Sequence, residues 1–175
     1  MKSNRLSSLR RRTFLAAAPA ALVAACSGAG NSSQAFAATP SPDYADSDWR
    51  RLSEAEWQAR LEPLAFRVLR EEATERAFTS PLNDEKRNGV FHCAGCDLAI
   101  FESRTKYDSG TGWPSFYDYI PGTLGFKEDN KLWMKRTEYH CARCGGHHGH
   151  VFKDGPAPTG LRYCNNGVAL TFKAA

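Results

Sequence analysis

The chain has 175 residues, of which 42% are hydrophobic and 24% charged, and these proportions exclude a disordered or collagen-like protein. This length favours one domain whose core needs no disulfide bonds. The formal charge of +4 originates in the first 26 residues, which hold five basic side chains, whereas residues 27–175 carry 18 basic against 19 acidic ones. A net charge this close to zero does not favour binding to the negatively charged phosphate backbone, so we expect no nucleic-acid partner.

The N-terminal segment has the composition of an export signal. Arg11 and Arg12 precede an apolar run over residues 16–25, which is too short for a helix to span a bilayer, since about 20 residues are needed. The paired arginines resemble the bacterial twin-arginine signal, whose pathway exports folded proteins. We therefore expect residues 1–26 to be a signal peptide and the mature protein to be periplasmic.

Two processing sites are compatible with this segment. Val23-Ala24-Ala25-Cys26 resembles a bacterial lipobox, in which Cys26 is lipidated and tethers the protein to a membrane, whereas ordinary signal peptidase would cut near Ala37. The lipobox is favoured because it ends the apolar run directly. Residues 27–48 are rich in Ser, Gly, Ala and Pro and are expected to form a flexible linker before a single domain over residues 49–175.

The domain is expected to begin with helical turns and to continue with strands. Ser53 and Glu56 have the spacing of a capping box, and apolar residues at helical spacing predict a helix from Glu54 to Arg70, which Pro63 can split. Short apolar or aromatic runs between turn residues then follow at 90–92, 98–101, 132–135, 139–140, 151–152 and 168–172. This order predicts a mainly β (α+β) fold, a small antiparallel β-sheet domain with N-terminal helices.

Two C-x-x-C pairs predict a metal site. Cys93 with Cys96 and Cys141 with Cys144 together offer the four thiolates that a tetrahedral Zn²⁺ takes, and a zinc with all positions filled is structural. The 44 residues between the pairs exceed the spacing of a compact zinc ribbon, so the metal is expected to join two distant hairpins. Two disulfides are the alternative in an exported protein, although export after folding would allow zinc to be loaded first.

The remaining cysteine of the domain, Cys164, is the candidate nucleophile. If its segment is a strand, Arg162 and Asn166 lie on the same face, and a nearby positive charge lowers the pKa of a thiol and makes it more reactive. A buried and inert cysteine is the competing interpretation.

Histidines and one tryptophan are further candidates. Three histidines crowd a glycine-rich segment at His147, His148 and His150, where such residues are more often exposed or metal-ligating than catalytic. Trp113 lies between Gly112 and Pro114, either as a core aromatic that closes a turn or as part of a binding site. Spacing alone leaves these alternatives open.

Six segments closely resemble, in order and spacing, the peptide methionine-R-sulfoxide reductase B family. They are Cys93-x-x-Cys96, the Ser-Gly-Thr-Gly-Trp-Pro-Ser-Phe run at 109–116, Cys141-x-x-Cys144-Gly-Gly-His147, Gly149-His-Val-Phe152, Asp154-Gly-Pro156 and the Gly-Leu-Arg-Tyr-Cys-Asn-Asn run at 160–166. The resemblance covers about residues 53–172 and implies the family's fold with one structural zinc ion.

The resemblance also implies roles for these residues. In that family the residue matching Cys164 attacks the sulfur of methionine R-sulfoxide and becomes a sulfenic acid, which a thiol later reduces. The other matched residues surround the reaction: Arg162 and Asn166 near the nucleophile, His147 and His150 as acid and orienting groups, Trp113 and Phe152 against the substrate. The implied partners are oxidised proteins or peptides and a thioredoxin-like thiol reductant, and we expect a monomer.

Four positions depart from the family pattern. Thr111 stands where many members have a resolving cysteine, so we expect a one-cysteine enzyme that an external thiol recycles without an internal disulfide. Asn165 replaces a usually apolar residue, Gly167 a usual Ser, and His148 a common Leu; we expect His148 to face solvent. Two other functions remain as alternatives: a catalytically inactive, zinc-stabilised binding module of the same fold, and a dithiol oxidoreductase that uses one C-x-x-C pair.

Overall fold

The computed structural model of this chain describes residues 44–131 and 135–175. The predicted signal peptide, Cys26, most of the predicted linker and most of the run at 132–135 lie outside these ranges. In the described part of the chain, no helix has both the length and the apolar character needed to cross a membrane.

Pro63 divides the predicted N-terminal helix in two. Helix α1 (Glu54–Arg60) begins at the predicted capping box, in which the Ser53 N–H donates to Glu56 Oε2 at 2.8 Å and the Glu56 N–H donates to Ser53 Oγ at 3.4 Å. Helix α2 (Pro63–Glu71) begins with Pro63, because the first turn of a helix needs no N–H donor there. The buried side chains of α2 are Ala65, Phe66, Val68 and Leu69.

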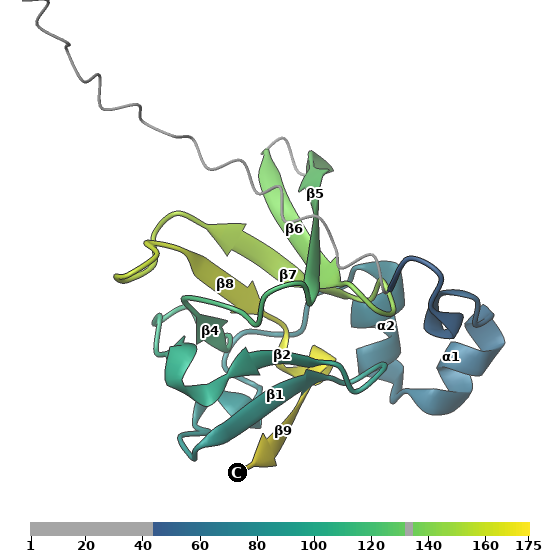
Figure 1. Ribbon diagram of the computed structural model, residues 1–175, viewed down its shortest axis with the longest axis horizontal. Helices are drawn as coiled ribbons and strands as arrows, with labels where there is room; N and C mark the ends of the chain where they lie inside the picture. Colours follow the sequence, from purple (N-terminus) through teal and green to yellow (C-terminus); the bar gives the residue numbers. More distant parts are fainter. Residues whose placement is uncertain (1–43, 132–134) are drawn as a thin grey trace, which may run out of the picture. The chain divides into compact units, whose positions relative to one another are not determined.

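The strands form two antiparallel sheets, which confirms the mainly β prediction (Figure 1). The three-stranded sheet has the order β2-β1-β9 and is built from β1 (Gly89–Cys93), β2 (Ala99–Glu102) and β9 (Leu170–Ala174). The six-stranded sheet has the order β3-β4-β8-β7-β6-β5 and is built from β3 (Lys106–Tyr107), β4 (Ser115–Phe116), β5 (Leu124–Asp129), β6 (Arg136–Cys141), β7 (His147–Phe152) and β8 (Arg162–Asn165).

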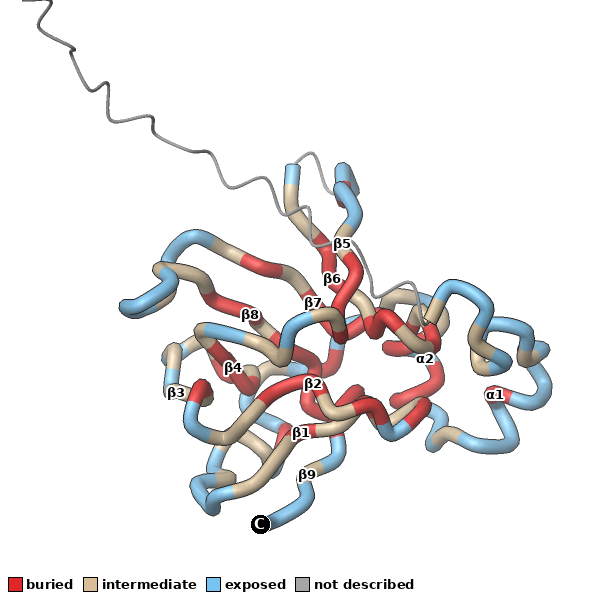
Figure 2. Tube along the Cα trace, in the orientation of Figure 1, coloured by how far each residue is buried: buried red, intermediate tan, exposed pale blue. Residues whose placement is uncertain are grey.

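Aromatic side chains from both sheets form the core. Phe101 of β2 stacks on Phe116 of β4 with ring centroids 4.1 Å apart, and Phe91 of β1 meets the same ring at 5.0 Å. Tyr139 of β6 and Tyr163 of β8 pack edge to face at 5.6 Å. Burial is deep in the strands that carry these rings and along α2 (Figure 2). Since side chains alternate along a strand, the residues next to Tyr139 and Tyr163 point to the opposite face of the larger sheet.

His148 is buried, and the expectation that it faces solvent is wrong. Tyr139 lies opposite Gly149, whereas the next residue of β6, His140, lies opposite His147, so β7 holds one additional residue at this point. This β-bulge turns His148 into the core, where it is 0% exposed. Its Nδ1 lies 3.2 Å from Asn165 Oδ1, which also accepts a hydrogen bond from the Tyr139 hydroxyl at 2.9 Å.

The buried imidazole predicts a loss of stability in acid. Burial lowers the pKa of His148 to about 3, below the value of about 6.5 expected in the unfolded chain. As the pH falls, His148 therefore takes up a proton in the unfolded chain before it does so in the folded protein. Its contribution to the free energy of unfolding is full above about pH 6.5 and is lost as the pH falls toward 3. We expect urea unfolding to show a loss of several kcal/mol across this window in the wild type and a smaller loss in His148→Leu.

The control for this experiment removes another histidine. His92→Gln eliminates a partly exposed ring and keeps His148, so its stability is expected to fall with pH as in the wild type. Identical pH slopes in His148→Leu and the wild type would show that His148 contributes nothing to acid sensitivity.

Candidate active site and metal centre

The four paired cysteines lie together, as predicted. Their Sγ atoms are all within 4.8 Å of one another, with Cys93 3.6 Å from Cys144 and Cys96 3.5 Å from Cys141. Sulfurs about 2.3 Å from one tetrahedral ion would be about 3.8 Å apart, so the cluster fits a single metal ion. These distances exceed the roughly 2.05 Å of a disulfide, and the described cysteines are free. A set of four thiolates is typical of structural zinc.

Two matching turns present these cysteines, one from each sheet. In the first pair, Cys93 ends β1 and Cys96 lies in the turn before β2; in the second, Cys141 ends β6 and Cys144 lies in the turn before β7. After each pair comes a residue with positive φ, Asp97 at 60° and Gly145 at 72°, whose N–H donates to the carbonyl of Cys93 or Cys141 at 2.8 and 2.9 Å. Arg70 of α2 donates to a carbonyl of the second turn at 3.0 Å. The metal site therefore joins two distant hairpins, as the spacing predicted.

Cys164 belongs to a row of polar residues that crosses the larger sheet. Ser115 of β4 lies opposite Cys164 of β8, and Cys164 lies opposite His150 of β7. The row continues from His150 to Glu138 of β6 and from Glu138 to Lys127 of β5. Residues directly opposite in a sheet point to the same face, so the thiol, an imidazole and a carboxylate share the face away from the aromatic core.

Arg162 is held rigidly near Cys164. Its Nε and Nη2 donate to Oδ1 and Oδ2 of Asp154, both at 2.8 Å, and its guanidinium lies 4.3 Å from the ring centroid of Phe152. Phe152 is directly opposite Arg162 in the β7–β8 register. The ion pair and the stacked ring fix the direction of the guanidinium, and Arg162 as a whole is only 8% exposed.

The protonation of Cys164 reflects opposing influences. Burial raises the pKa of this half-buried thiol, whereas Arg162 and the Thr111 hydroxyl lower it. The net direction is upward, so Cys164 rests as the thiol at neutral pH. Arg162 acts in the direction expected from the sequence, but the cost of burying a thiolate outweighs it.

Two histidines that face this site each have a carboxylate partner. His150 Nε2 lies 2.7 Å from Asp129 Oδ2, and His147 Nδ1 lies 3.2 Å from Glu138 Oε1. The two rings are 5.5 Å apart between centroids. Burial lowers the pKa of His150 despite the hydrogen bond to Asp129, so this ring is neutral at pH 7.

Both carboxylates stay ionised in spite of burial. Burial raises the pKa of Asp129, but the Lys131 N–H, His150 and Arg136 outweigh it and lower the value to about 2. Burial likewise raises the pKa of Glu138, and its contacts with His147 and Lys127 bring it below its usual value. Neither carboxylate was a candidate in the sequence analysis.

Trp113 and Asn166 belong to one hydrogen-bonded chain. Trp113 Nε1 donates to the Glu75 carbonyl at 3.1 Å, and the Glu75 N–H donates to Asn166 Oδ1 at 2.9 Å. Asn166 Nδ2 then donates to the His148 carbonyl at 2.9 Å. Asn166 thus connects β7 to the segment before β1, and it is only 4% exposed. Trp113 is partly exposed near the polar row.

A hollow of about 380 Å³ lies on the β3 side of Cys164. Its lining includes Thr111 and Arg162, both of which act on the Cys164 thiol.

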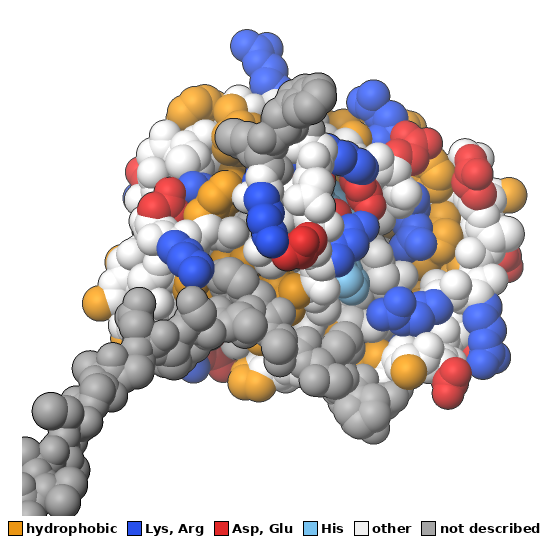
Figure 3. Space-filling model, turned by 90° about the horizontal axis from the view of Figure 1, so that it is seen from above, with side chains coloured by type: hydrophobic (Ala, Val, Ile, Leu, Met, Phe, Trp, Pro, Cys, Tyr) orange, Lys and Arg blue, Asp and Glu red, His pale blue; other side chains and the backbone are white. Residues whose placement is uncertain are grey.

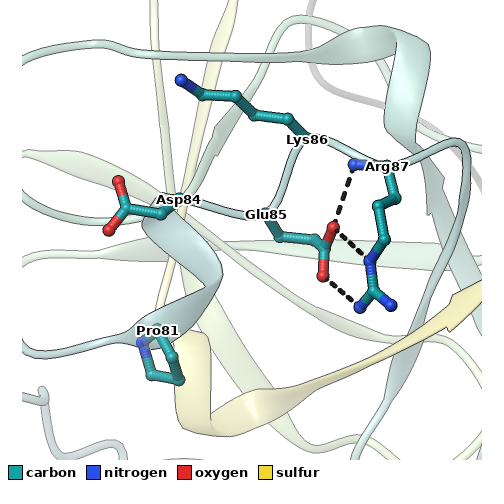
Figure 4. A pocket seen from close by; sticks show the side chains of 5 residues that line it. All are labelled: Pro81, Asp84, Glu85, Lys86 and Arg87. Atoms are coloured by element: carbon teal, nitrogen blue, oxygen red, sulfur yellow. Dashed lines mark hydrogen bonds and ion pairs between the residues drawn. The ribbon is translucent and has the colours of Figure 1, made fainter.

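Another hollow, of about 500 Å³, is lined by the charged loop before β1: Pro81, Asp84, Glu85, Lys86 and Arg87 (Figure 4). Glu85 and Arg87 pair with each other there at 2.6 Å, and no predicted site residue lines it. Basic and acidic side chains are interspersed on the face in Figure 3.

Comparison with known proteins assigns the family. Residues 61–174 match the SelR domain. This chain belongs to the SelR-domain family. Peptide methionine sulfoxide reductase MsrB of Methanosarcina barkeri is 53% identical over 122 residues, which are 69% of this chain and 86% of the relative. MsrB of Pseudomonas putida is 54% identical over 119 residues, 67% and 90% of the two chains, and MsrB of Agrobacterium fabrum is 48% identical over 122 residues, 69% and 90%.

The SelR assignment confirms the family named from the six motifs. The matched range includes both cysteine pairs and Cys164. Among solved structures, the "Yippee-like" domain of Mis18 aligns with 51% of this chain and 98% of its own, with a TM-score of 0.39 and 18% identity.

Proposed function

We propose that this SelR-family protein reduces the R epimer of methionine sulfoxide in peptides and proteins, with Cys164 as the nucleophile. Its relatives at 53% and 54% identity are peptide methionine sulfoxide reductases, which supports the reaction class. One observation carries the residue assignment: Cys164 is the described cysteine outside the metal cluster, and strand register places it directly opposite His150.

The reaction transfers one oxygen atom between two sulfur atoms. The sulfoxide S–O bond breaks, an Sγ–O bond forms on Cys164, and the thiol proton ends on that oxygen, which yields a sulfenic acid and methionine. The methionine sulfur is reduced by two electrons and the cysteine sulfur is oxidised by two. Because no proton is gained or lost overall, a raised pKa of Cys164 is compatible with turnover if nearby groups move its proton to the sulfoxide oxygen.

The imidazoles are placed to move this proton. His150 lies opposite Cys164, and the His147 ring follows at 5.5 Å between centroids. Asp129, 2.7 Å from His150 Nε2, orients that ring and stabilises its imidazolium form during transfer, and Glu138 Oε1 lies 3.2 Å from His147 Nδ1. An oxide ion is too basic to leave at neutral pH, so protonation of the oxygen is the step for which these groups are needed.

Three other residues act on charge and shape. Arg162 stabilises negative charge on the Cys164 sulfur as it loses its proton, and Phe152 supports the guanidinium from the opposite strand. Trp113, oriented by its bond to the Glu75 carbonyl, packs against the S-methyl group, where a sulfur–aromatic contact contributes about 0.3 to 1.5 kcal/mol.

The metal has a structural role in this proposal. Zinc held by Cys93, Cys96, Cys141 and Cys144 supplies no open position for substrate, and it stabilises the two hairpins that carry its ligands. These four sulfurs are then unavailable for recycling.

An external thiol completes the cycle. Thr111 stands near Cys164 where many relatives were expected to have a second cysteine, and its hydroxyl lies 2.8 Å from Ser109 Oγ. Two thiols of a thioredoxin-like reductant convert the sulfenic acid to thiol and water and become a disulfide.

The predicted signal peptide supports export of the protein to the periplasm and a lipid tether at Cys26. The intact mass of the mature protein isolated from membranes would test whether Cys26 carries a lipid.

The decisive experiment uses peptides that carry the separated R and S epimers of methionine sulfoxide, with dithiothreitol as reductant. We expect turnover of the R epimer only, and one turnover without reductant should leave a dimedone-reactive sulfenic acid on Cys164. Non-reducing peptide mapping should find no bond from Cys164 to another cysteine. A binding module would reduce neither epimer, and a dithiol oxidoreductase would titrate as a thiol pair without stoichiometric zinc.

A further inference from the structure

An aromatic side chain stands exposed next to the site. Phe78 is 75% exposed, and among residues 44–131 and 135–175 it is the one large hydrophobic residue that is exposed. A ring of this size left in water forgoes the free energy that burial would provide, so its position needs a physical reason.

The backbone of Phe78 adopts an uncommon conformation. Its φ is +65°, in the left-handed region that bulky L-residues rarely occupy. The Phe78 N–H donates to the Gly112 carbonyl at 2.7 Å, which holds the residue in place. Backbone strain of this kind is found most often at binding and catalytic sites.

The ring of Phe78 rests on the loop that carries Trp113. A Cβ atom built on Gly112 would come within 2.8 Å of two carbons of this ring, and Gly112 itself has a φ of +89°. Glycine therefore makes room for the ring. Gly112 lies between Thr111, which acts on the Cys164 thiol, and Trp113. The Phe78 ring that packs on Gly112 is therefore one residue along the chain from both.

Three hydrogen bonds make this arrangement rigid. The Gly112 carbonyl accepts from the Phe78 N–H and, at 3.1 Å, from Asn83 Nδ2. The Glu75 carbonyl, three residues before Phe78, accepts from Trp113 Nε1 at 3.1 Å. A backbone fixed before binding loses little conformational entropy on contact with a ligand.

We propose that Phe78 binds an apolar side chain that flanks methionine sulfoxide in a polypeptide, so that the protein prefers oxidised methionines in hydrophobic sequence contexts. This inference rests on the proposed function. Consecutive Cα atoms are about 3.8 Å apart, so a residue that flanks a methionine sulfoxide held at Trp113 is within reach of the ring over the neighbouring Gly112. Methionine is common in protein cores, where the residues beside it are often apolar.

The test compares two peptides that differ only around the sulfoxide, one with Gly and one with Leu at the two positions on each side. We expect the wild type to have a kcat/KM about 5- to 20-fold higher for the Leu peptide, the range for burying part of an aromatic ring. Phe78→Asn tolerates positive φ and lacks the apolar ring, so its ratio is expected to fall near 1. The difference should lie in KM, because Phe78 does not touch the reacting atoms.

Two further variants separate ring contact from loop structure. Phe78→Leu restores an apolar side chain and is expected to recover most of the preference, whereas Asn83→Ala removes a hydrogen bond to Gly112 and should change both peptides alike. Equal kcat/KM for the two peptides in the wild type, or an unchanged preference in Phe78→Asn, would overturn the inference while leaving the reductase function intact. Failure to reduce either peptide would instead refute the proposed function.

Discussion

Loss of the metal is expected to unfold this protein. The four clustered sulfurs belong to turns of two different sheets, and without an ion these turns lose the bonds that join them. Structural zinc contributes about 10–16 kcal/mol in small zinc domains, which matches or exceeds the net stability of roughly 5–15 kcal/mol of a typical domain. Cys141→Ser is therefore expected to purify without stoichiometric zinc and to show no cooperative thermal transition.

Metal analysis and circular dichroism melting check this expectation. The matched control is Cys164→Ser, which changes a half-buried cysteine outside the cluster and should keep one zinc per chain and a melting temperature near that of the wild type. Exhaustive chelation of the wild type should reproduce the behaviour of Cys141→Ser. A Cys141→Ser protein that melts like the wild type would show that the cluster does not stabilise the fold.

Features set by local sequence were predictable. The capping box at Ser53, the break at Pro63 and the metal cluster each depend on residue types at fixed short spacing. Strand β5 was not expected, because Lys127, Glu128 and Asp129 give its second half the composition of a loop. Pairing with β6 along its full length holds this segment as a strand.

Features set by register were not predictable. Simple alternation along β7 would place His148 with His150, and only the additional residue opposite β6 reverses that order. Glu138 reaches His147 from the neighbouring strand β6, and Asp129 reaches His150 from β5, one strand further across the sheet, so spacing along the chain carried no signal for them. For Glu138 the sequence did contain a signal. Side chains alternate along the Arg136–Cys141 strand, so Glu138 points to the same face as Arg136 and away from the face of Tyr139.

Replacement of Cys164 by serine is expected to abolish reduction of the R-sulfoxide peptide, with a loss of at least about 10³-fold in kcat, comparable to the removal of nucleophiles in other covalent mechanisms. Serine oxygen is a poor nucleophile toward sulfur and cannot be oxidised to a sulfenic acid. The measurement is steady-state turnover with dithiothreitol, together with the yield of methionine in one turnover without reductant.

Thr111→Val is the matched comparison because it removes only a hydroxyl that faces the thiol. Burial already raises the pKa of Cys164, and loss of this hydroxyl, which lowers it, should raise it further and slow turnover by about tenfold or less, the scale of one hydrogen bond. A graded effect at Thr111 with a complete loss at Cys164 distinguishes a residue that tunes the sulfur from the sulfur that reacts. If Cys164→Ser kept a tenth of wild-type turnover, oxygen transfer would have to occur at a different cysteine, and the polar row across the larger sheet would not be the reaction site.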